Sequence, residues 1–140
     1  MTDTAATTHT LTIERTLPHP QEKVWRALTE GRLIEEWLMP NDFEPVEGHR
    51  FQFRSTPAPG WNGIIDSEVL VVEPKSRLSF SWATMGMESA VTLTLTPTPD
   101  GTHLRMEHSG FPSEESASYK GAKYGWTSFL GKLESVVGGL

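Results

Sequence analysis

His108 is the residue of this sequence whose type and position best suit chemistry. It follows Leu104 and Met106 on the apolar face of an alternating segment, where a titratable group is unexpected. An imidazole in this place could donate a hydrogen bond to a ligand, or act as an acid or a base. It could instead be a histidine whose nitrogens are satisfied by Tyr119, Ser109 or a backbone carbonyl, and we favour this interpretation.

The other polar residues predict no second chemical centre. His103 and His108 are five residues apart on a strand, so they face opposite sides and cannot share a metal ion. Glu68 is on the same face of its strand as Leu70 and Val72, so it could be a buried carboxylate facing an internal cavity. We favour a solvated rim position, because unpaired carboxylates are rarely buried. The absence of cysteine excludes a thiolate zinc site and a cysteine nucleophile. We therefore predict no metal, no cofactor and no catalytic residue.

Strand pairing should bring His108 close to two apolar side chains. If the hairpin at Asp100-Gly101 is symmetric, Val91 lies near His108. If the turn at residues 85–88 is symmetric as well, Trp82 lies near Val91. The three side chains would then form one row across the buried face of the sheet.

The last helix could cover this row with Tyr119, Lys123 and Trp126. An aromatic-lined space with few polar groups suits a small-molecule pocket. The same side chains could simply fill the core, and we keep both alternatives. The predicted ligand-binding residues are Phe53, Trp82, Val91, Met106, His108, Tyr119 and Trp126.

Two periodicities predict the elements that must position these residues. Alternation of apolar and polar residues predicts strands at about 9–17, 51–54, 64–72, 78–83, 91–96 and 103–108. Helical spacing predicts two short helices, around 24–28 and 33–38, and a long one through 119–137. The order β-α-α-β-β-β-β-β-α, with short connections, predicts an antiparallel meander in an α+β domain.

The long last helix has an unusual composition. We expect Ser113 to be its N-cap, with two glutamates in the first turn. Gly121, Gly125 and Gly131 each cost up to about 1 kcal/mol relative to alanine in a helix. Close approach of the helix backbone to the sheet or to the short helices would explain them.

Length and composition limit the function classes. The chain of 140 residues predicts one domain, residues 9–138, after a polar, disordered tail at 1–8. Five Trp and six Phe within a hydrophobic fraction of 36% predict an aromatic core. A net charge of −6 without a basic stripe argues against nucleic acid and anionic membranes as partners. With no signal peptide and no transmembrane run, we expect a cytoplasmic protein.

Six motifs together resemble a known family. The bacterial proteins similar to the C-terminal domain of the activator of the 90-kDa heat-shock protein's ATPase share them in this order. These proteins are part of the START-like, or SRPBCC, superfamily, and the resemblance covers roughly residues 9–137. The motifs are VW at 24–25, EW at 36–37, EVLVVEP at 68–74, RLSFSW at 77–82, GTHLRMEHSGF at 101–111 and GW at 125–126.

The resemblance implies a helix-grip (Bet v 1-like) fold, with a curved antiparallel sheet around a long C-terminal helix and an apolar cavity between them. In the superfamily this cavity holds lipids, polyketides, hormones or nothing identified. We therefore expect the protein to bind a small, largely apolar molecule. The resemblance also implies two alternatives. One is a cyclase- or aromatase-like enzyme using His108 or Tyr119, and the other is a co-chaperone-like domain with a protein partner. An interior filled by side chains would argue against the cavity.

Overall fold

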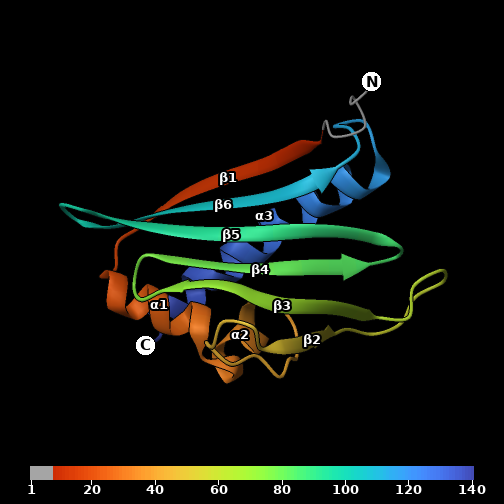
Figure 1. Ribbon diagram of the computed structural model, residues 1–140. Helices are drawn as coiled ribbons and strands as arrows, with labels where there is room; N and C mark the ends of the chain where they lie inside the picture. Colours follow the sequence, from red (N-terminus) through yellow and green to blue (C-terminus); the bar gives the residue numbers. More distant parts are fainter. Residues whose placement is uncertain (1–7) are drawn as a thin grey trace.

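The computed structural model describes residues 8–140 as a six-stranded antiparallel sheet with two short helices and one long helix (Figure 1). The element order is the predicted one. The predicted tail falls on residues 1–7, which lie outside the described residues, and on Thr8, which is exposed and in no element. The elements are β1 His9–Leu17, α1 Gln21–Thr29, α2 Gly31–Trp37, β2 Arg50–Arg54, β3 Ile64–Glu73, β4 Arg77–Thr84, β5 Met87–Thr98, β6 Gly101–Phe111 and α3 Ala117–Gly138.

β1 and β2 form the two edges of the sheet. The strand order is β1-β6-β5-β4-β3-β2, so the connection through α1 and α2 carries the chain from one edge to the other. The next five strands return as an antiparallel meander until β6 pairs with β1, with Leu11 opposite His108. This register gives the sheet one continuous buried face that reaches from β2 to β1.

α3 covers this buried face, which we call the inner face (Figure 1). Its buried residues are Trp126, Leu130, Leu133 and Val137, and their spacing of four, three and four residues forms a single helical stripe. The helix also contacts α1, α2 and β1. The inner face and this stripe together form the core of the protein.

The two short helices are held by packing, as expected of helices of nine and seven residues. The indole nitrogen of Trp37 in α2 donates a hydrogen bond of 2.8 Å to the carbonyl of Ala27 in α1. The Trp37 ring also lies 6.4 Å from the Trp126 ring of α3, between centroids. One tryptophan thus joins all three helices.

The predicted start of the last helix is wrong. Ser116 is the N-cap, and its hydroxyl oxygen accepts a hydrogen bond of 3.2 Å from the backbone N–H of Tyr119. The carbonyl of Ser113 instead accepts a bond of 2.7 Å from the Ser116 hydroxyl. Residues 113–116 therefore form a turn before the helix, and two serines with the same capping chemistry could not be told apart by type alone.

The explanation given for the glycines of the last helix is also wrong. A Cβ atom built on Gly121 or Gly131 has no neighbour within 4 Å, so both positions face open space. A Cβ on Gly125 meets only the ring of Phe129, in the same helix, at 3.6 Å. The three glycines therefore do not allow close approach to the sheet or to the short helices, and they weaken α3 without a packing benefit.

The β4–β5 turn corrects one predicted pairing. Val91 lies opposite His108 as predicted, but Trp82 lies opposite Ser89, and Phe80 takes the place beside Val91. The reason is a tight turn with Met85 and Gly86 at its centre, both at positive φ (53° and 77°), as in a type I′ hairpin. Methionine rarely adopts this conformation, so the residue types at 85–86 did not indicate a two-residue turn.

Candidate functional site

His108 lies on the inner face of β6 and is 2% exposed. The indole N–H of Trp126 in α3 is within 3.0 Å of its Nδ1 atom, and the hydroxyl of Ser89 in β5 is within 2.8 Å of its Nε2 atom. An indole nitrogen can only donate, so Nδ1 must accept and the imidazole proton is on Nε2. Ser89 then accepts from His108 and donates its own proton to the carbonyl of Trp82, at 2.8 Å.

This chain of hydrogen bonds fixes His108 as a neutral imidazole. Burial lowers its pKa from 6.5 to about 4, because a charged ring would be poorly solvated here. At neutral pH both ring nitrogens are therefore used inside the protein. The ring is poorly placed to act as an acid or a base, since its lone pair already accepts from Trp126.

The favoured interpretation of His108, a histidine satisfied within the protein, is confirmed, but its partners differ from those predicted. Trp126 and Ser89 hold the ring, in place of Tyr119, Ser109 or a backbone carbonyl. Ser89 was missed because its place beside His108 depends on the register set by the β4–β5 turn.

Five rings make a continuous wall between β2 and α3, which we call the aromatic cluster. Neighbouring ring centroids lie between 5.1 and 6.4 Å apart, at tilted or edge-on angles. Such geometries add attraction to the burial of the rings. The aromatic cluster consists of Phe51, Phe53, Phe80, Trp82 and Trp126.

The structure brings the seven predicted residues together on the inner face or over it. Val91 and Met106 are fully buried, and Trp82 lies 5.5 Å from the His108 ring. Tyr119 packs edge-on against Phe111 at 5.4 Å, at the border of the cluster. Lys123 was expected to close over this row, but it lies exposed on the outer side of α3. Their binding of a ligand stays a prediction.

These side chains occupy much of the space between the sheet and α3 with their own rings. Hollows lie elsewhere on the surface of residues 8–140, and none of the seven predicted residues lines the following three. The 380 Å³ hollow lies between the start of α1 and the β5–β6 turn, and the 430 Å³ hollow lies on the outer side of α3. Apart from Tyr119, the predicted residues are at most 9% exposed, so the interior is filled by side chains, which argues against the preformed apolar cavity that was expected. A ligand on the inner face would have to displace some of these side chains.

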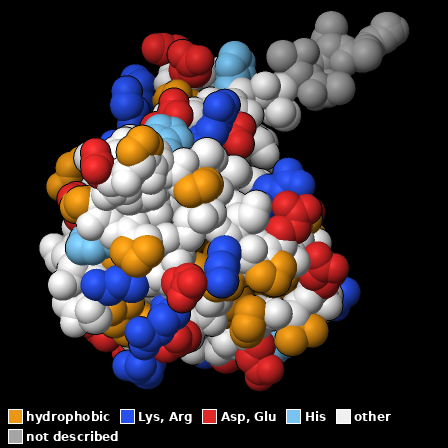
Figure 2. Space-filling model, turned by 90° about the vertical axis from the view of Figure 1, so that its left-hand side faces the viewer, with side chains coloured by type: hydrophobic (Ala, Val, Ile, Leu, Met, Phe, Trp, Pro, Cys, Tyr) orange, Lys and Arg blue, Asp and Glu red, His pale blue; other side chains and the backbone are white. Residues whose placement is uncertain are grey.

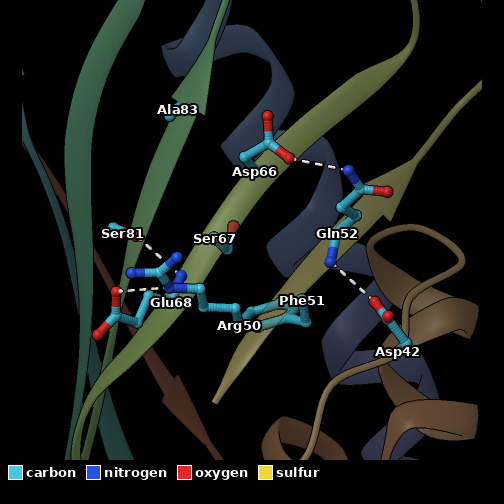
Figure 3. Close-up of a pocket in the computed structure, with 9 residues that line it drawn as sticks. All are labelled: Asp42, Arg50, Phe51, Gln52, Asp66, Ser67, Glu68, Ser81 and Ala83. Atoms are coloured by element: carbon cyan, nitrogen blue, oxygen red, sulfur yellow. Dashed lines mark hydrogen bonds and ion pairs between the residues drawn. The ribbon is translucent and has the colours of Figure 1, made fainter. Parts of the chain in front are cut away.

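The third hollow, of about 440 Å³, lies on the outer face of β2, β3 and β4 and is polar (Figure 3). Gln52 donates to the carboxylate of Asp66 at 2.9 Å, and its backbone N–H donates to Asp42 at 2.8 Å. Glu68, expected at a solvated rim, forms an ion pair of 3.6 Å with Arg50 and is 41% exposed. The carboxylates and the amide of this hollow thus have partners, whereas Ser67, which also lines it, does not.

Ser67 is a buried polar residue that was not predicted from the sequence. It lies on the inner face of β3 between Ile65 and Val69, and its hydroxyl oxygen has no hydrogen-bond partner among the described residues. An unpaired buried hydroxyl costs about 1–3 kcal/mol. The signal was available, since a serine interrupts an otherwise apolar alternation in a strand.

On the face shown in Figure 2, acidic and basic side chains are interspersed with hydrophobic atoms.

Within residues 8–140, no group of three or more His, Asp or Glu side chains is placed to hold a metal ion. No helix of that same part of the chain has the length and apolar character needed to cross a membrane.

A family model described as "Activator of Hsp90 ATPase homolog 1-like protein" matches residues 18–138. The chain belongs to this family. The match and the helix-grip architecture confirm the predicted family and fold class. No curated protein matches the chain.

Several solved structures resemble this member of the Hsp90 activator homologue family. Protein MLL2253 from Mesorhizobium loti is 50% identical with a TM-score of 0.86, over 92% of this chain and 96% of its own. CalU16 from Micromonospora echinospora is 26% identical with a TM-score of 0.80, over 98% and 81%. DynU16, a protein of the dynemicin biosynthetic locus, is 27% identical with a TM-score of 0.76, over 90% and 46%.

Proposed function

We propose that the protein binds a small, largely apolar molecule between the inner face of the sheet and α3. The observation that carries this proposal is the aromatic cluster, which spans the interior from β2 to α3. Binding sites for small molecules are typically lined by apolar and aromatic side chains with a few polar groups. The occurrence of the similar DynU16 in a biosynthetic locus supports a small-molecule ligand.

Entry of the ligand requires that some rings of the aromatic cluster move aside. Trp82 is the ring best suited to do so, because at 9% exposure it is the least buried of the cluster. Partly buried apolar side chains pack against the core, and these could adjust with it. They include Trp61, Met87, Tyr119, Ala122 and Phe129.

Binding is better supported than catalysis. A cyclase- or aromatase-like enzyme needs a polar pair within hydrogen-bond reach in the interior, and His108 and Ser89 form such a pair at 2.8 Å. In the tautomer fixed by Trp126, however, the imidazole donates to Ser89 and cannot take its proton. Ser89 is therefore not activated as a nucleophile, and we propose no reaction at this pair.

A co-chaperone-like role has weaker support. It would need an exposed apolar surface for a protein partner. The large apolar side chains exposed among the described residues come from different segments, so no single element presents an apolar face. They are Val46, Leu70, Met85 and Tyr124.

The proposal is tested by screening the purified protein against fatty acids, flavonoids and polyketide-like aromatic compounds, with ligand-observed NMR and thermal shift. A hit should be lost in Trp82→Ala. It should be kept in Tyr124→Ala, a matched aromatic truncation on the exposed outer side of α3. No hit across the panel, or a hit that Trp82→Ala leaves intact, would contradict the proposed function. A hit altered only by His108→Ala would favour the enzyme instead.

A further inference from the structure

Ser67 is the one buried polar side chain whose hydrogen-bonding capacity is left open within residues 8–140. Its side chain is 6% exposed, and its hydroxyl oxygen is fully covered without a partner. Buried hydroxyls in native proteins nearly always have a partner, so each exception asks for an explanation. A group supplied from outside the chain is one such explanation.

The register places Ser67 within the aromatic cluster. Phe51 of β2 lies directly opposite Ser67 on one side. On the other side, the pairing of Asp66 with Ala83 puts Trp82 of β4 opposite Ser67. A polar group of a molecule held among these rings would therefore meet the Ser67 hydroxyl.

His108, the other buried polar side chain beside the aromatic cluster, has no free hydrogen-bonding atom to offer a ligand. The nitrogens of His108 are both occupied, by Trp126 and by Ser89. Ser89 in turn donates to the carbonyl of Trp82. A ligand that bonded to His108 would have to break this chain, whereas a bond to Ser67 breaks nothing.

Nearby charges indicate which polar groups can be accepted. Asp66, Ser67 and Glu68 all line the outer hollow (Figure 3), but only Asp66 and Glu68 are on the exposed face of β3, where they are bound to Gln52 and Arg50. No Lys or Arg is among the buried residues of the described chain. An anionic group beside Ser67 would therefore be buried without a counter-charge, which is strongly unfavourable.

The geometry points to Ser67 as the polar anchor of the ligand site, and to a neutral aromatic ligand with a hydroxyl or carbonyl group. This inference rests on the proposed function, since it concerns the same site. A serine hydroxyl can donate to a carbonyl or accept from a phenol, so both groups suit it. His108 is then part of the wall and not a ligand contact.

The test compares two probes that differ by a single hydroxyl, 2-naphthol and naphthalene, by calorimetric titration. The wild-type protein should bind 2-naphthol more tightly, by on the order of tenfold. Ser67→Ala should reduce this preference to about twofold or less while naphthalene affinity is kept. The variant should fold, because it removes an unpaired buried group. Ser79→Ala, a buried serine of β4 bonded to Thr92, is the matched control and should keep the preference.

The outcomes separate this inference from the proposed function. If both probes bind but Ser67→Ala keeps the preference, Ser67 is not the anchor and the function stands. If the wild-type protein binds both probes equally, the Ser67 hydroxyl makes no hydrogen bond to the probe, and the inference is again overturned. If neither probe binds the wild-type protein, the proposed site itself is contradicted.

Discussion

The buried, neutral state of His108 predicts that the protein loses stability in mild acid. Its pKa is about 4 when folded, against about 6.5 in the unfolded chain. Between these values the unfolded state binds more protons, so the free energy of unfolding rises with pH. The free energy of unfolding has its full value, as far as His108 is concerned, above about pH 6.5. It falls by roughly 3 kcal/mol in total as the pH is lowered to about 4.

The assay is urea unfolding of the wild type and of His108→Asn at about pH 7.5 and about pH 5.0. The amide oxygen of the asparagine can accept from Trp126 in place of Nδ1, but it does not titrate. Between these two pH values the wild type should lose about 2 kcal/mol more than the variant. The other four histidines are present in both proteins, so the difference isolates position 108.

Equal pH dependence of the two proteins, within about 0.5 kcal/mol, would refute this reasoning. An NMR titration gives a direct check, because it follows the imidazole signals of His108 alone. A pKa near the ordinary value would mean that the ring is solvated, and the hydrogen bonds from Trp126 and to Ser89 would then not persist in solution.

Two further predictions concern stability. Gly121→Ala and Gly131→Ala should each raise the free energy of unfolding by about 0.5–1 kcal/mol, because the added methyl group meets nothing within 4 Å. Gly101→Ala should lower the free energy of unfolding, since its Cβ would collide with the carbonyl oxygen of Leu17. No change in the three proteins would contradict both expectations. Met85→Asn should stabilise the protein by roughly 0.5 kcal/mol in thermal unfolding, because asparagine adopts the φ of 53° at this turn more readily than methionine. A lower unfolding midpoint would show that the Met85 side chain makes a stabilising contact.

The features of the fold that could be predicted are those with a local cause. The alternation in β5 and β6 and the turn chemistry between them correctly place Val91 opposite His108. The β4–β5 register could not be predicted in the same way, because its turn holds Met85 in a conformation that methionine seldom adopts. The apolar stripe of α3 was visible, but its N-cap was not, since Ser113 and Ser116 offer the same hydroxyl.

The residues of the candidate site could be predicted from the sequence, but their hydrogen-bond partners could not. The aromatic residues and His108 could be recognised on their strands, since the alternation within each strand indicates its buried face. Which polar atoms meet across strands depends on register and on the rotation of α3. Ser89 and the indole of Trp126 were therefore missed as partners of His108, and Ser67 was missed as a hydroxyl without one.

The most direct test of the account is to locate a bound molecule by intermolecular NOEs, using labelled protein with 2-naphthol. The account predicts contacts between ligand protons and the rings of Phe53, Trp82 and Trp126, which line the space between the sheet and α3. NOEs only to residues of the outer hollow, such as Gln52 and Ala83, would contradict it.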